Sequence, residues 1–219
     1  NVNRYRFVEF PIYSSLVYFG YVLNGGVDER IARLVSIIFS LGSTVFIYFI
    51  VKKYSTTIHA LLSALIFATL PFGIYCGRVI LPEPSLIFFC LGMFYFVDRW
   101  IMETEGKYLG LGNKKGLMFW GIFFTACAFL TKPMAAFFLL PLAYTYYLKE
   151  GFRFPPLRYF LFIIPALLPF GLWRVWISQF PEGIPASSWL LNGNGIRFRP
   201  AFFRWIIGDL RGSYLNECG

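Results

Sequence analysis

The sequence consists largely of apolar runs that are long enough to cross a lipid bilayer. The run from Leu34 to Val51 contains no charged residue, and as a helix rising ~1.5 Å per residue it reaches about 27 Å, close to the ~30 Å hydrocarbon core. Hydrophobic residues make up 58% of the chain and aromatic residues 21%, against 14% charged residues, which is unlike an ordinary soluble domain. The sequence therefore predicts an all-α, polytopic transmembrane protein.

Apolar windows divide the chain into one interfacial helix and six membrane-spanning segments. The stretch from Pro11 to Leu23 would be only ~20 Å long as a helix, so we expect it to lie along the interface. The six spans are expected near residues 31–51, 57–76, 84–102, 116–131, 133–148 and 157–178, with the fourth and fifth forming a hairpin. The expected domains are an extracytoplasmic segment with a juxtamembrane helix (1–28), a transmembrane domain (29–178) and an extracytoplasmic loop leading toward a further span (179–219).

The basic residues of the short loops predict the orientation of the chain. If the loop at Lys52 and Lys53 is cytoplasmic, alternation of the spans also places the basic loops at 99–115 and 149–158 inside. The turn 78–84, the hairpin tip 131–133 and residues from 178 onward then lie outside. The net charge of +9 is explained by this topology, by lipid headgroups and by an anionic substrate, and no stretch is typical of a nucleic-acid-binding groove.

Several kinds of chemistry lack their residues in this sequence. The four cysteines, at positions 76, 90, 127 and 218, form no CxxC pair and have no histidine at metal-ligand spacing. No P-loop, dinucleotide-binding, zinc-protease or nucleophile-elbow motif occurs. The chain begins without a methionine and ends in a hydrophilic stretch, so we expect it to be a fragment of a longer polytopic protein.

The few charges near the ends of the apolar runs are the candidate functional residues. Glu83 follows Pro82 and precedes Pro84, which suits the start of a helix, so it is either a simple helix-start acid or, with Arg78 five residues earlier, part of an anion site. Lys132 lies between two short apolar runs, and its ammonium is either a snorkelling charge or a group presented to a phosphate. Glu9, before the interfacial helix, and Arg174, near the outer end of the last span, complete the set.

In order and spacing, these motifs resemble the GT-C type membrane glycosyltransferases that take a sugar from a polyprenyl-phosphate donor. That group includes the protein O-mannosyltransferases and the lipid A aminoarabinose transferase. The resemblance extends over most of the chain and rests on the segments 8–13, 30–53, 78–84 and 130–133. Phe10 stands where the family commonly has lysine, Glu83 where it more usually has aspartate, and the turn at Thr131, Lys132 and Pro133 is one residue shorter.

The resemblance implies a GT-C-like membrane region and transfer of a sugar, with inversion, to a lipid, glycan or protein acceptor on the extracytoplasmic face of a bacterial plasma membrane. Arg78, Lys132 and Arg174 would bind the donor phosphate, since cations at headgroup depth stabilise the charge of a phosphate leaving group. Glu83 and Glu9 would assist catalysis by positioning acceptor or donor. The general base of the family is expected upstream of Asn1, so the fragment alone should be inactive.

The resemblance also implies the partners of the protein. These are a polyprenyl-phosphate-linked sugar and membrane lipids, without nucleic acid, and we expect neither a metal nor another cofactor. Two other classes remain open. A secondary transporter or flippase would have broken helices, and Pro165 and Pro169 are expected to break the last span. A structural subunit of a membrane complex would use its aromatic residues for helix and lipid packing alone.

Overall fold

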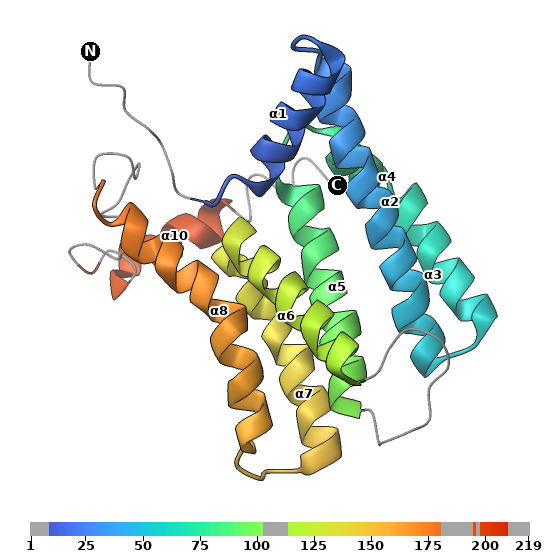
Figure 1. Cartoon of the computed structure of the whole chain (residues 1–219), viewed down its shortest axis with the longest axis vertical. Helices are drawn as coiled ribbons and strands as arrows, with labels where there is room; N and C mark the ends of the chain where they lie inside the picture. The colour runs from blue at the N-terminus through green and yellow to red at the C-terminus, as the bar shows by residue number, and fades with distance from the viewer. Residues whose placement is uncertain (1–8, 103–113, 181–194, 196–197, 210–219) are drawn as a thin grey trace. The chain divides into compact units, whose positions relative to one another are not determined.

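The computed structural model describes residues 9–102, 114–180, 195 and 198–209, and helices without strands make up the regular structure of these residues. The chain divides into two units. The first is Glu9–Trp176, and the second comprises Asn1–Val8 and Ile177–Gly219. Figure 1 shows the helices of both. The first unit contains α1 (Ile12–Asn24), α2 (Glu29–Tyr54), α3 (Thr57–Thr69), α4 (Pro71–Arg78), α5 (Glu83–Met102), α6 (Lys114–Thr131), the 3₁₀-helix η1 (Pro133–Phe138), α7 (Leu139–Glu150) and α8 (Leu157–Ile177) up to its last residue; the second contains α10 (Pro200–Asp209).

The start of the first long helix follows directly from its sequence. Asp28 is the N-cap of α2, and its carboxylate accepts a hydrogen bond from the Arg30 backbone N–H at 2.8 Å. Glu29 lies in the first turn, and Lys52 and Lys53 lie in the last. Acids at the N-terminus and cations at the C-terminus both interact favourably with the helix dipole and stabilise the helix. The residues around Asp28 therefore explain where α2 begins.

Helix α5 forms the centre of the first unit, with α2, α6 and α7 packed around it. Within an 18-residue apolar stretch of α5, 56% of the residues are buried inside the protein. The corresponding values are 11% for α2 and 17% for α8. The difference means that α2 and α8 present apolar side chains outward, as lipid-facing helices do. The core around α5 is rich in phenylalanine, and the rings of residues 39, 46, 88, 89, 96 and 124 contact one another.

Two glycines allow the helices to approach α5 and its neighbours closely. A Cβ on Gly92 would lie 2.2 Å from Phe124 of α6, and one on Gly42 of α2 would lie 2.5 Å from Phe88. Small residues serve this purpose between membrane helices, where packing rather than the hydrophobic effect drives association. The rings of Phe124 and Phe88 fill the space that these glycines leave.

Within the residues that the structure describes, three helices are long and apolar enough to cross a membrane, namely α2, α5 and α8, so the expectation of about six spans is not confirmed. The segment expected at 57–76 is divided between α3 and α4. Pro71 disfavours helical backbone at Leu70, which has φ −56° and ψ 127°, and itself begins the next helix. The segment expected at 133–148 likewise consists of η1 followed by α7.

The expected break in the last span is wrong. Helix α8 continues from Leu157 to Ile177 with Pro165 and Pro169 inside it. A proline removes one backbone hydrogen bond without ending a helix when the flanking residues hold it, and this is common in membrane helices. Residues 202–207, within the segment expected to be a loop, lie in α10 of the second unit.

Candidate functional site

Lys132, Glu83 and Glu9 lie together in the first unit, although they come from three separate segments. The Lys132 Nζ atom lies 2.5 Å from Glu83 Oε1 and 3.8 Å from Glu9 Oε1. We call these three residues the lysine–glutamate cluster. The side chains are 23%, 40% and 33% exposed in that order, so all three remain partly accessible from outside.

The backbone explains why the three side chains meet. Helix α6 ends at Thr131, and the extended backbone of Lys132 (φ −155°, ψ 138°) turns the chain into η1 at Pro133. The segment before α1 is attached to the same helix end, because the Phe10 N–H donates to the Leu130 carbonyl at 3.0 Å. This bond brings the neighbouring Glu9 to Lys132.

Glu83 reaches the cluster from the first turn of α5. Its Oε1 atom accepts the hydrogen bond from Lys132, whereas its Oε2 atom is buried without a hydrogen-bond partner among the described residues. A buried carboxylate oxygen without a donor is unfavourable by about 1–3 kcal/mol or more. Glu83 can therefore accept a further hydrogen bond, for example from a hydroxyl group.

The protonation of Glu9 is shifted by its surroundings. Burial raises the pKa of Glu9 above its usual value, and the negative charge of Glu83 raises it further. Lys132 and, more weakly, Arg174 lower the same pKa, but burial has the larger effect. Two carboxylates share one ammonium in the cluster, so a proton on Glu9 removes its excess negative charge.

Arg174 lies on α8 close enough to influence Glu9. Its guanidinium lies over the Phe170 ring, 5.5 Å from the ring centre. One residue earlier, the rings of Trp173 and Phe10 pack edge to face, with their centres 5.0 Å apart. The end of α8 thus packs against the segment that carries Glu9.

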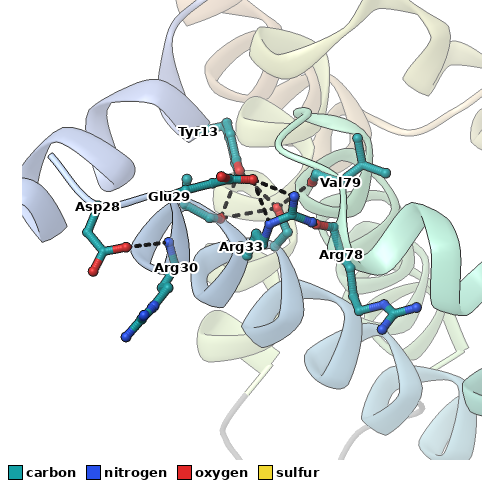
Figure 2. Close-up of polar contacts among 9 residues, drawn as sticks. Tyr13, Asp28, Glu29, Arg30, Arg33, Arg78 and Val79 are labelled. Atoms are coloured by element: carbon teal, nitrogen blue, oxygen red, sulfur yellow. Dashed lines mark hydrogen bonds and ion pairs between the residues drawn. The ribbon is translucent and has the colours of Figure 1, made fainter.

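Arg78 lies at the end of α4 and makes no contact with Glu83 among the described residues. Its backbone carbonyl accepts a hydrogen bond from Arg33 at 3.2 Å, and Arg33 is also paired with Glu29. Figure 2 shows the Arg78 side chain extending away from this group. The expected pairing of Arg78 and Glu83 within one turn is replaced by the pairing of Glu83 with Lys132.

A buried hydrogen-bond chain fixes the neighbouring helix α1. The Tyr13 hydroxyl is 2.9 Å from both the Ala32 carbonyl and the Ser36 hydroxyl, and Ser36 donates to the Val79 carbonyl at 2.8 Å (Figure 2). This chain joins α1, α2 and the segment before α5. It therefore supports both the segment that carries Glu9 and the turn that leads to Glu83.

Asp98, the most deeply buried acid of the described residues, is not among the functional residues predicted from the sequence. Asp98 is 2% exposed and lies near the opposite end of α5 from Glu83. It pairs with Lys53 of α2 and accepts a hydrogen bond from the Tyr54 hydroxyl at 2.5 Å. The available signal was an acidic residue inside an apolar run, which is rare in a membrane segment and normally has a partner.

No group of three or more His, Cys, Asp or Glu side chains within the described ranges is arranged to hold a metal ion. What the lysine–glutamate cluster offers is one ammonium, one carboxylate oxygen able to accept a hydrogen bond, and one glutamate with a raised pKa. Such groups can bind an anion and position a hydroxyl.

Comparison with known proteins gives the family. The sequence profile of the family described as dolichyl-phosphate-mannose-protein mannosyltransferase matches residues 11–176. An uncharacterized protein of Aquifex aeolicus (strain VF5) is 36% identical over 101 residues, which are 45% of this chain and 24% of that protein. The chain thus matches about a quarter of the length of this relative. No solved structure matches.

The family match covers most of the chain, including α5, α8 and the turn with Lys132, and the apolar helices agree with a membrane protein. Members of this family are membrane glycosyltransferases of the GT-C type that use polyprenyl-phosphate sugar donors. The chain belongs to the dolichyl-phosphate-mannose-protein mannosyltransferase family.

Proposed function

We propose that the chain is the part of an inverting glycosyltransferase that binds the phosphate end of a polyprenyl-phosphate sugar on the extracytoplasmic face. The observation that carries the proposal is the position of Lys132, which a helix break presents between Glu83 and Glu9. An ammonium has three N–H donors. One is directed to Glu83, and the others remain for phosphate oxygens.

In the proposed reaction, an acceptor hydroxyl oxygen attacks the anomeric carbon, and the bond from that carbon to the phosphate oxygen breaks. The phosphate leaves with the electron pair, and Lys132 stabilises the charge that develops on it. The hydroxyl proton passes to a carboxylate base, for which we propose a residue outside this sequence. Attack from the face opposite the phosphate inverts the configuration.

The two glutamates have separate tasks in this scheme. Glu83 Oε2, which is buried without a partner among the described residues, would accept a hydrogen bond from a sugar or acceptor hydroxyl. Glu9, whose raised pKa favours its neutral form, would carry a proton when the phosphate binds and so reduce repulsion between like charges. Arg174 and Arg78 would add positive charge along the path of the donor.

In this proposal the chain still crosses the membrane six times. Besides α2, α5 and α8, these would be α6 and the two interrupted segments α3–α4 and η1–α7. Helix α8 is unbroken, although the α3–α4 and η1–α7 segments are interrupted as transporter helices can be. The family match supports the glycosyltransferase over the transporter or flippase.

The test is transfer of radiolabelled sugar from polyprenyl-phosphate donors by membranes that carry the full-length protein. We expect Lys132→Ala to lower kcat/KM by about 10²–10³-fold, as the loss of one charge-stabilising donor does, and Glu83→Gln to lower it as well. The matched control is Lys52→Ala, which removes a positive charge in the last turn of α2, outside the lysine–glutamate cluster, and should leave transfer unchanged. Full activity in Lys132→Ala, or no transfer by the parent protein over a broad donor panel, would contradict the proposal.

A further inference from the structure

An open cleft lies at the connection between α7 and α8, at the opposite end of the η1–α7 segment from Lys132. Its volume is about 530 Å³, which is within the range of small-molecule sites. Half of its lining residues are aromatic, and one lining residue, Arg153, is charged. Tyr146, Tyr147, Phe152 and Phe154 line the cleft together with Arg153.

The cleft is formed by a well-defined loop. Helix α7 ends where Gly151 adopts φ 67°, and the Gly151 N–H donates to the Tyr147 carbonyl at 2.9 Å. The Tyr146 hydroxyl donates to the Arg153 carbonyl at 2.8 Å, and the rings of Tyr147 and Phe152 are 4.6 Å apart. These contacts hold the backbone of Arg153 in place and leave its side chain at the cleft.

Among the described residues, the guanidinium of Arg153 lacks the polar partner that each of the two neighbouring cations has. Lys149 donates to the Ile101 carbonyl, and Arg158 is paired with Glu150 at 2.5 Å. Within the described part of the chain, the exposed guanidinium of Arg153 has neither a hydrogen-bond nor an ion-pair partner. With three cations and one acid, this connection also carries an excess positive charge.

The aromatic side chains of the cleft are exposed to an unusual degree. Phe152 is 97% exposed and Phe154 is 84% exposed, and the spanning helix α8 begins three residues after Phe154. Large exposed apolar side chains beside the end of a membrane span are expected at the level of the lipid headgroups, where their rings contact acyl chains. A cation at the same level meets the phosphate of a lipid.

We propose that this cleft binds the headgroup phosphate of an anionic phospholipid of the surrounding bilayer. Arg153 contacts the phosphate, and Phe152 and Phe154 contact the first part of the acyl chains. The positive charge of the connection favours an anionic headgroup over a zwitterionic one. The positively charged loops predict the cytoplasmic leaflet for this site, so it is separate from the lysine–glutamate cluster and independent of the donor lipid.

Native mass spectrometry of the full-length protein in neutral detergent tests the proposal. The protein is titrated with phosphatidylglycerol and, separately, with phosphatidylcholine. We expect tighter binding of phosphatidylglycerol, and about fivefold weaker binding of that lipid by Arg153→Gln, the effect of one cation at a membrane surface. Arg153→Lys should retain more of the binding, and Phe152→Ser should weaken both lipids.

Lys52→Gln is the matched control, because it removes an exposed positive charge on the same predicted face but outside the cleft. An equal loss in Lys52→Gln would overturn the proposal in favour of a general surface attraction. Equal affinity of the parent protein for the two lipids would overturn it as well. Inorganic phosphate or glycerol phosphate that displaces the lipid at comparable concentration would show a soluble phosphate site instead.

Discussion

The Lys132 ammonium lies 2.5 Å from the Glu83 carboxylate, and the two residues are 49 positions apart in the sequence. The contact joins the break after α6 to the first turn of α5. Because both elements belong to the same tightly packed pair of helices, the contact is a property of the fold and not of a single turn. Glu9, at 3.8 Å from the same ammonium, adds the segment before α1 to the arrangement.

The Lys132–Glu83 pair should contribute little to stability even if it is essential for activity. The side chains are 23% and 40% exposed, and an accessible ion pair contributes about 0–1 kcal/mol. A double-mutant cycle with Lys132→Met and Glu83→Gln, measured by unfolding in detergent, should therefore give a coupling free energy below about 1 kcal/mol. A coupling of several kcal/mol would assign the pair a mainly structural role.

Stability should depend on pH through Glu9. Burial raises the pKa of Glu9 above its usual value of 4.5, so the folded protein binds this proton more tightly than the unfolded chain does. The contribution of Glu9 is therefore favourable below pH 4.5 and is lost as the pH rises through the raised pKa. Melting temperatures measured from pH 4.5 upward should fall less in Glu9→Gln than in the parent. Glu29→Gln, an exposed control, should follow the parent; the same slope in Glu9→Gln would contradict the assignment.

Removal of the Asp98 charge should be strongly destabilising. Asp98 is 2% exposed, and Asp98→Asn leaves Lys53 without its counter-charge. Breaking one side of a buried pair lowers the free energy of unfolding by about 3–5 kcal/mol. Chemical unfolding should show this loss, whereas Asp28→Asn should be nearly neutral, because asparagine also caps a helix.

A second variant separates charge from packing at this position. Replacement of both partners, in Lys53→Met with Asp98→Leu, should recover much of the stability, since paired apolar residues often replace a buried ion pair without loss. An Asp98→Asn variant as stable as the parent would show that the pair does not hold α2 against α5.

The contact of α5 with α6 should not tolerate a larger residue at position 92. A methyl group on Gly92 would lie 2.2 Å from the Phe124 ring, which the surrounding aromatic side chains hold in place. Gly92→Ala should lower the free energy of unfolding by about 1–3 kcal/mol. Gly116→Ala in α6 meets no atom within 4 Å, and it should be neutral or slightly stabilising because alanine favours helix. Equal effects of the two substitutions would contradict the close approach.

Several features could be predicted from single segments. The cap at Asp28, the end of α1 at Gly25 and the start of α5 at Glu83 each depend on residues within one turn. The division at Pro71 and the continuity of α8 were not anticipated, since a proline ends a helix or remains within it according to what packs around it. Asp98 was missed because its partners, Lys53 and Tyr54, are 45 and 44 residues away.

The sequence by itself determined that this protein is helical and apolar enough for a membrane, and that its few charges gather near the ends of apolar runs, because both properties depend on hydropathy and residue type. Only the tertiary structure decided which charges meet. Glu83 could pair with Arg78 in its own turn or with a distant cation, and the packing of α5 against α6 selected Lys132. An ion pair requires atoms within about 4 Å, and separation along the chain does not fix such a distance.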